Sequence, residues 1–129
     1  NVAEKVSLDQ LLAMSDVVTV HCPLGPETRG LIGAAQMQRM KKGAILINSA
    51  RGGIVDEAAC ATALKSGHLG GAALDVFDYE PIKAETGKLF AGIPNVILTP
   101  HISGVTVEAN HRVSFMTVES VARVLKKGR

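Results

Sequence analysis

Four short apolar runs, separated by segments with helical patterning, constrain the fold more than any other feature of the sequence. The runs cover residues 16–20, 44–47, 72–74 and 96–98. Each is almost continuously apolar, whereas a half-exposed strand alternates apolar and polar residues, and such runs are typical of strands buried on both faces. Because strand and helix patterns alternate along the chain, the sequence predicts an α/β fold with a parallel sheet covered by helices.

The segments between these runs carry recognisable helix signals. Ser7 and Gln10 form a capping-box pattern, which predicts a short helix that continues through Met14. Three further helices are predicted over 34–40, from Asp56 to Gly67, and from Thr106 to about Lys126. The last of these carries an apolar stripe at helical spacing, formed by Phe115, Val118, Ala122 and Leu125. The stretch between 80 and 94 is irregular, and we expect at most one short turn of helix there.

Composition bounds the class of protein. With 129 residues, 47% hydrophobic and 20% charged, the chain is long and apolar enough for one globular domain. A net charge of +2 and 3% aromatic residues give no support for nucleic-acid or membrane partners. We therefore expect a cytoplasmic protein. Cys22 and Cys60 are expected to be reduced, and no ligand spacing predicts a metal site.

Ionisable side chains follow each of the four predicted strands. The first strand ends at His21, the second leads to Arg51, the third to Asp75 and Glu80, and the fourth to His101. In open parallel sheets, ligands bind beyond the carboxyl ends of the strands. The sequence therefore predicts that these groups meet at one sheet edge and form part of an active site.

Arg51 is the candidate for binding an anionic ligand. It is followed by Gly52 and Gly53, which allow a sharp turn and the close approach of a ligand. A guanidinium in such a turn can bind a carboxylate through two hydrogen bonds. An ion pair with Asp56 or Glu57 at the start of the next helix is an equally good reading of the spacing.

Glu80 and His101 are the candidates for proton transfer. A carboxylate that pairs with an imidazole fixes its tautomer and favours its protonated form, which suits a proton donor near neutral pH. The alternative is a structural histidine bonded to the backbone, with Asp75 capping a loop. The gathering of four ionisable groups at one predicted edge favours the catalytic reading.

Four stretches together resemble a known family. They are 20–24 with Thr28, 47–57, 71–77 with Glu80 and Pro81, and 99–104. They are similar, in order, to the signatures of the D-isomer-specific 2-hydroxyacid dehydrogenases, which include phosphoglycerate, glycerate or hydroxypyruvate, and sulfolactate dehydrogenases. The match covers nearly the whole chain.

The resemblance implies an oxidoreductase that transfers a hydride between NAD and a small 2-hydroxy or 2-keto acid, with NADP as the alternative cofactor. It implies that Arg51 binds the substrate carboxylate, that His101 is the general acid or base, and that Glu80 keeps His101 protonated before reduction. The residues implied to contact the cofactor are Cys22, Ser49, Ala50, Arg51, Asp75, His101, Ser103 and Gly104.

The sequence also departs from the family pattern. It contains no Gly-x-Gly-x-x-Gly turn, which binds the pyrophosphate in such domains. We therefore expect residues 1–129 to be the second half of a Rossmann-like, doubly wound domain, without the Gly-rich half and the substrate domain, and to be inactive alone. A homodimer is expected for the full-length protein. The alternative functions are an NAD-sensing, corepressor-like binding module and an inactive fragment.

Overall fold

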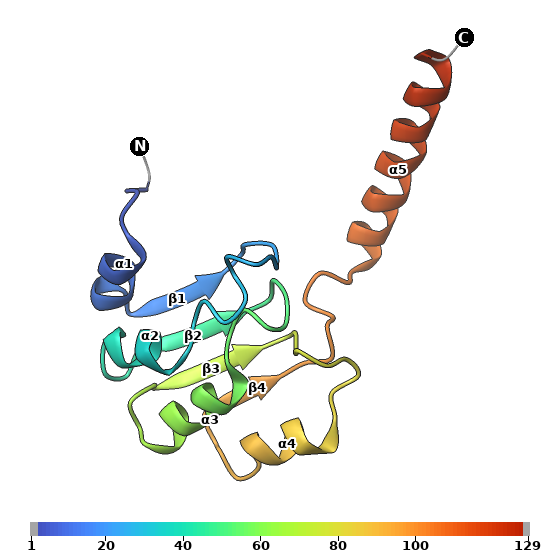
Figure 1. The fold of residues 1–129 in the computed structure, drawn as a ribbon. Coiled ribbons are helices and arrows are strands. Elements are labelled where there is room, and N and C mark those ends of the chain that lie inside the picture. Colours follow the sequence, from blue (N-terminus) through green and yellow to red (C-terminus); the bar gives the residue numbers. More distant parts are fainter. Residues whose placement is uncertain (1–2, 128–129) are drawn as a thin grey trace.

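A four-stranded parallel sheet forms the centre of the computed structural model, which describes residues 3–127 (Figure 1). Its strands are β1 (Val17–Val20), β2 (Ile45–Asn48), β3 (Gly71–Leu74) and β4 (Val96–Leu98). They lie side by side in chain order, β1-β2-β3-β4. The predicted α/β class and all four predicted strands are confirmed.

The described residues also form five helices, of which one precedes the sheet, three connect its strands and one follows it. They are α1 (Leu8–Met14), α2 (Ala34–Arg39), α3 (Glu57–Lys65), α4 (Ala84–Phe90) and α5 (Val107–Lys127). The capping box predicted at Ser7 is present, with the Ser7 hydroxyl accepting from the Gln10 N–H. One expectation was wrong: α4 is a helix of seven residues and not a single turn. Its last residue, Phe90, is buried in the core, and this packing stabilises a segment with weak local signals.

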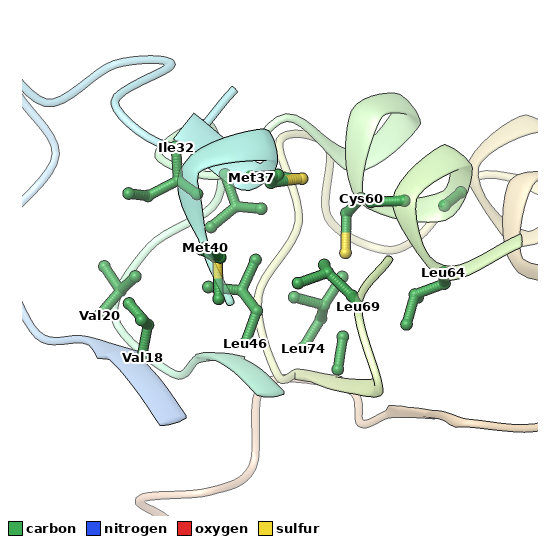
Figure 2. Packing of buried hydrophobic residues seen from close by; sticks show 14 of the residues in the cluster. Val18, Val20, Ile32, Met37, Met40, Leu46, Cys60, Leu64, Leu69 and Leu74 are labelled. Atoms are coloured by element: carbon green, nitrogen blue, oxygen red, sulfur yellow. The ribbon is translucent and has the colours of Figure 1, made fainter. Parts of the chain in front are cut away.

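The hydrophobic core lies between the sheet and the helices on one of its faces. Figure 2 shows strand residues such as Leu46 and Leu74 directed toward Met37 of α2 and Cys60 of α3. Aliphatic side chains and methionines fill this layer, as expected for a chain with few aromatic residues. Burial raises the pKa of the Cys60 thiol to about 12, so Cys60 is a packing residue that stays protonated at neutral pH.

The opposite face of the sheet is open in the described part of the chain, contrary to the expectation of two covered faces. Val17 is 51% exposed, Ile45 41% and Ile97 65%. The strand order explains this, because successive right-handed crossovers in one direction place every connecting helix on the same face. The continuous apolar runs therefore supply one buried face and one apolar face that these helices leave uncovered.

Helix α5 extends away from the sheet (Figure 1). From Val107 to Lys126 its side chains are exposed, except for the half-buried Ala109 and Ala122. Even Phe115, part of the predicted apolar stripe, is 70% exposed. Among residues 3–127, no helix is both long enough and apolar enough to cross a membrane.

Candidate active site

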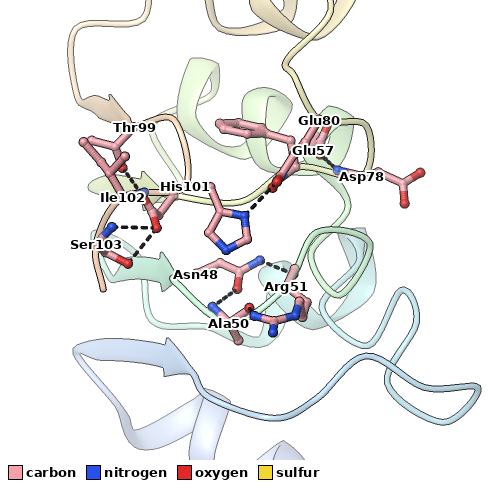
Figure 3. Close-up of polar contacts among 12 residues, drawn as sticks. Asn48, Ala50, Arg51, Glu57, Asp78, Glu80, Thr99, His101, Ile102 and Ser103 are labelled. Carbon is pink, nitrogen blue, oxygen red and sulfur yellow. Dashed lines mark hydrogen bonds and ion pairs between the residues drawn. The ribbon is translucent and has the colours of Figure 1, made fainter. Parts of the chain in front are cut away.

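The four strands end at the same level, which brings their following loops together. Val20 is the register partner of Asn48, Asn48 of Leu74, and Leu74 of Leu98. The loops that carry His21, Arg51, Glu80 and His101 therefore begin at one edge of the sheet, as predicted. Figure 3 shows the side chains that three of these loops contribute.

Glu80 and His101 form the central pair of this edge. The Glu80 Oε2 and His101 Nδ1 atoms lie 2.7 Å apart (Figure 3). The other carboxylate oxygen of Glu80 accepts a hydrogen bond from the Phe77 N–H at 2.9 Å. The hydrogen bond with His101 and this backbone bond lower the pKa of Glu80 below its usual range.

The lowered pKa of Glu80 determines which His101 nitrogen carries the proton in the contact between the two residues. At neutral pH the Glu80 carboxylate is ionised and can only accept hydrogen bonds, so the proton between the two groups belongs to His101 Nδ1. The Nε2 atom is then left to exchange a proton with a bound molecule. Since His101 is half exposed, such a molecule can reach this atom. A fixed tautomer with a free, accessible nitrogen is the arrangement that general acid–base chemistry requires.

The buried Asp75 carboxylate holds the turn that carries His101. One of its oxygens accepts from the Thr99 hydroxyl at 2.6 Å and the Ile102 N–H at 2.9 Å, and the other from the Ser103 N–H and hydroxyl at 3.0 and 2.6 Å. Burial opposes ionisation of Asp75, but the four hydrogen bonds outweigh burial and hold its pKa well below the usual range. Because both carboxylate oxygens are engaged within the protein, Asp75 is well placed to position the turn.

The backbone of His101 is strained. Its φ of 56° lies in the left-handed region, which residues with a Cβ rarely adopt. The His101 N–H donates to the Asp75 carbonyl at 2.8 Å, and the side chain is bound to Glu80. Contacts on both sides of the residue thus hold it in a conformation that its own chemistry disfavours, which is common at functional sites.

Arg51 lies in a turn shaped by Asn48, a residue to which the sequence analysis assigned no role. Asn48 is 2% exposed; its side-chain oxygen accepts from the Ala50 N–H at 3.1 Å, and its amide group donates to the Arg51 carbonyl at 3.0 Å (Figure 3). A polar residue at the end of an apolar run was the signal for this role. The Arg51 Nη1 atom donates a hydrogen bond to the carbonyl oxygen of the preceding residue, Ala50, at 2.6 Å.

The alternative ion pairs of Arg51 do not form in the structure. Asp56 caps α3 by accepting from the Ala59 N–H at 2.9 Å, and Glu57 accepts from the Asp78 N–H at 2.7 Å. Arg51 is exposed, and no hydrogen bond or ion pair joins it to Glu80 or His101 within the described residues. Its charge is therefore accessible to a ligand at the sheet edge.

The remaining residues predicted to contact a cofactor lie around the same edge. Cys22 is half-buried and packs against the core, and Ser49 and Ala50 are half-buried in the turn after β2. Ser103 and Gly104 are exposed after His101, and no atom lies within 4 Å of a Cβ added at Gly104. No group of three His, Cys, Asp or Glu side chains suited to a metal ion occurs over residues 3–127.

A pocket of about 580 Å³ opens beside the Glu80–His101 pair. Its lining consists of Phe77, Glu80, Pro81, Ile82, Leu98, Thr99, Pro100 and His101. Most of these side chains are apolar, and Glu80 and His101 are its ionisable groups. Such a lining is suited to a small molecule that His101 approaches from one side.

Comparison with known proteins identifies the family. Residues 1–103 match the model described as "D-isomer specific 2-hydroxyacid dehydrogenase, NAD binding domain". The chain belongs to this family. It is 50% identical over 118 residues to the (S)-sulfolactate dehydrogenase of Chromohalobacter salexigens, a match that covers 92% of this chain and 38% of that protein.

Solved structures agree with this assignment. A D-isomer specific 2-hydroxyacid dehydrogenase from Xanthobacter autotrophicus, in complex with NADPH, is 40% identical with a TM-score of 0.81, covering 93% of this chain and 48% of that one. The NAD-complexed form of a D-isomer specific 2-hydroxyacid dehydrogenase from Lactobacillus delbrueckii is 32% identical with a TM-score of 0.83, covering 100% and 45%. The chain thus spans less than half the length of these relatives.

Proposed function

We propose that the protein containing this chain is a dehydrogenase that interconverts a small 2-hydroxy acid and the corresponding 2-keto acid with NAD as cofactor. The observation that carries this proposal is the 2.7 Å contact between Glu80 and His101 Nδ1, at a sheet edge that also presents an exposed Arg51. The class of substrate follows from the names of the relatives and from the pairing of one carboxylate-binding group with one proton donor.

The residues at this edge fit the nicotinamide end of the cofactor. Ser49 and Ala50 form a half-buried turn at this edge, and Gly104, three residues after His101, is exposed with no atom within 4 Å of an added Cβ, which supports binding of a flat ring there. The Gly-rich turn that binds pyrophosphate is absent from the 129 residues. We therefore propose that residues 1–129 supply the catalytic half of the NAD-binding domain, and that NAD binds tightly only together with the Gly-rich half. NADP is the alternative cofactor, because one of the similar structures holds NADPH.

In this proposal, Arg51 and His101 bind different groups of the keto acid. The guanidinium binds the substrate carboxylate and lies near the adjacent carbonyl, which it polarises. His101 donates the Nε2 proton to the carbonyl oxygen during reduction and takes it back during oxidation of the alcohol. When bound, reduced NAD would supply the hydride.

Glu80 orients His101 for proton donation. With Glu80 ionised, its negative charge stabilises the imidazolium and holds Nδ1–H, so that Nε2 carries the transferable proton. After reduction the imidazole is neutral and is protonated again from solvent. Glu80 itself keeps its charge throughout the cycle.

The test uses the full-length protein with a series of 2-keto acids and NADH, followed by NADH absorbance. We expect His101→Gln to lower kcat by about 10²- to 10⁴-fold, because general acid catalysis is lost. Arg51→Gln should raise KM for the keto acid by at least about tenfold, since a charged, two-point contact is removed. Glu80→Gln should give a smaller loss of kcat than His101→Gln.

Tyr79→Phe is a suitable control for these variants, because Tyr79 lies in the same loop as Glu80 and is 60% exposed. It should leave both constants unchanged. The proposal would be wrong if the wild-type protein reduced none of the keto acids, or if His101→Gln retained the wild-type kcat.

A further inference from the structure

The peptide between Phe77 and Asp78 is held by the first residue of α3. The Glu57 Oε1 atom accepts a hydrogen bond from the Asp78 N–H at 2.7 Å (Figure 3). Glu57 is not needed as a helix cap, because Asp56 accepts from the Ala59 N–H and performs that role. The half-buried Glu57 side chain therefore serves a contact outside its own helix.

The turn that carries Arg51 also packs against this peptide. A Cβ added at Gly52 would lie 1.8 Å from the Phe77 carbonyl oxygen and 2.6 Å from the Asp78 nitrogen. The backbone at Gly52 is therefore in direct contact with the Phe77–Asp78 peptide. Farther out, Arg29 Nη1 lies 3.1 Å from Asp78 Oδ1, so a third loop is joined to the same place by an exposed ion pair.

The same segment also holds the proton-transfer pair. The Phe77 N–H donates to Glu80 Oε1, and Glu80 Oε2 binds His101 Nδ1. A continuous series of contacts therefore runs from α3 through the Phe77–Asp78 peptide to His101, and the Arg51 turn touches it midway. The Phe77–Asp78 peptide therefore contacts both the turn that carries Arg51 and the segment that holds the Glu80–His101 pair.

We propose that Glu57 is a positioning residue that fixes the separation between the Arg51 guanidinium and the His101 imidazole. This inference rests on the proposed function, in which the two groups bind neighbouring atoms of one small keto acid. Catalytic groups must be held within about 0.5 Å of their productive geometry, and a charge-assisted hydrogen bond to a backbone N–H can supply such a restraint. Glu57 has no role in proton transfer itself.

The test compares Glu57→Ala with Glu57→Gln in the full-length protein. The glutamine keeps a side-chain oxygen that can accept from the Asp78 N–H, whereas alanine leaves this donor without its partner. Glu85→Ala is the matched control, since Glu85 is an exposed glutamate in the first turn of α4 and its removal costs the same interaction with a helix N-terminus.

We expect Glu57→Ala to lower kcat by about ten- to a hundredfold, because a displacement of the catalytic groups lowers transition-state stabilisation. KM for NADH should stay within about twofold, since tight binding of the cofactor depends on the Gly-rich half and not on the Phe77–Asp78 peptide. Glu57→Gln should recover kcat to within about threefold of the wild type. Glu85→Ala should leave kcat and both KM values unchanged.

A second readout is independent of activity. The ¹⁵N chemical shifts of the His101 ring, assigned with His101→Gln, report which ring nitrogen carries the proton in the resting protein. We expect Glu57→Ala to shift the tautomer balance away from Nδ1–H, since Glu80 is no longer held in place, and Glu57→Gln to restore it. Loss of stability alone would not change this balance in the folded protein.

The two readouts separate this inference from the proposed function. If the wild-type protein reduces no keto acid, the proposed function is wrong. The ¹⁵N shifts of the His101 ring still test whether Glu57 positions the Glu80–His101 pair, because they do not depend on activity. The positioning role of Glu57 is wrong if the ring shifts of Glu57→Ala match those of the wild type, or if Glu57→Gln is as impaired as Glu57→Ala.

Discussion

Individual polar residues at the sheet edge act mainly by holding backbone in place. Asn48 shapes the Arg51 turn, Asp75 holds the turn after His101, and Glu57 holds the Phe77–Asp78 peptide. Each is buried or half-buried, and each accepts hydrogen bonds from backbone N–H groups that would otherwise lack partners. Arg51 and His101, by contrast, are exposed. The residues proposed to touch substrate are therefore supported by a separate set that does not.

The lowered pKa of Asp75 predicts how the free energy of unfolding changes at low pH. Its folded pKa, like that of Glu80, lies below the unfolded value, so the unfolded state takes up protons first as the pH falls. The stability that these groups contribute is thus present above the usual carboxyl pKa and is lost below it. We expect the free energy of unfolding to be steady above about pH 5 and to decline below about pH 4.

Asp75→Asn tests this prediction. At neutral pH it should lower the free energy of unfolding by about 2–3 kcal/mol, because an amide NH₂ replaces one acceptor facing N–H and O–H donors. It should also make the decrease in the free energy of unfolding below about pH 4 less steep. Urea titrations followed by circular dichroism at several pH values measure both effects. Asp16→Asn, which removes only an exposed pair with Lys41, should cost no more than about 0.5 kcal/mol; an equal cost for both variants would contradict the prediction.

At the scale of elements, the site depends on how closely the connections approach one another. The turn between β2 and α3 touches the segment after β3 at Gly52, where the space for a side chain is already filled by the Phe77–Asp78 backbone. Gly87 in α4 is the opposite case, because nothing lies within 4 Å of a Cβ added there. The two glycines share a residue type but serve different purposes: one permits contact between loops, and the other only lowers the helix propensity of α4.

Alanine substitutions distinguish the two glycines. Gly52→Ala should lower the free energy of unfolding by about 2–4 kcal/mol, because backbone must move to admit the methyl group. Gly87→Ala should raise it by about 0.5–1 kcal/mol through helix propensity alone. Urea denaturation of both variants is the measurement. Equal effects of the two substitutions would show that the contact at Gly52 relaxes without cost.

At the scale of the whole molecule, two apolar surfaces have no partner in the described structure. One is the open face of the sheet at Val17, Ile45 and Ile97, and the other is the apolar side of α5 around Phe115. The core on the covered face is one continuous cluster of buried side chains (Figure 2). Stability is therefore concentrated in the layer formed by the sheet and α1 to α4.

Hydrogen exchange of the 129-residue chain alone should reveal this uneven stability. The described side chains of helix α5 are almost all exposed, and helices in proteins take most of their stability from tertiary packing, so its amides should exchange at nearly unprotected rates. Amides of β2 and β3, at the centre of the sheet, should be strongly protected. Equal protection of α5 and β3 would mean that α5 packs against the sheet in solution.

The amino-acid sequence by itself determined most of the secondary structure and which residues gather at the candidate site. Strands, caps and helix ends depend on neighbouring residues, so Ser7, Asp56 and Gly67 marked the helix ends from local patterns. Parallel strands then place the residues that follow them at one edge, which is why the grouping of Arg51, Glu80 and His101 was predictable. The irregular segment that forms α4 lacked such patterns.

Only the tertiary structure decided how this edge is held together. The contacts of Glu57 with Asp78, of Gly52 with Phe77, and of Asp75 with the turn after His101 join residues 21 to 28 positions apart, and no local pattern encodes them. The open sheet face has the same origin, because strand order determines which side the helices cover. Local chemistry selects the elements, and long-range packing sets the distances between the groups they carry.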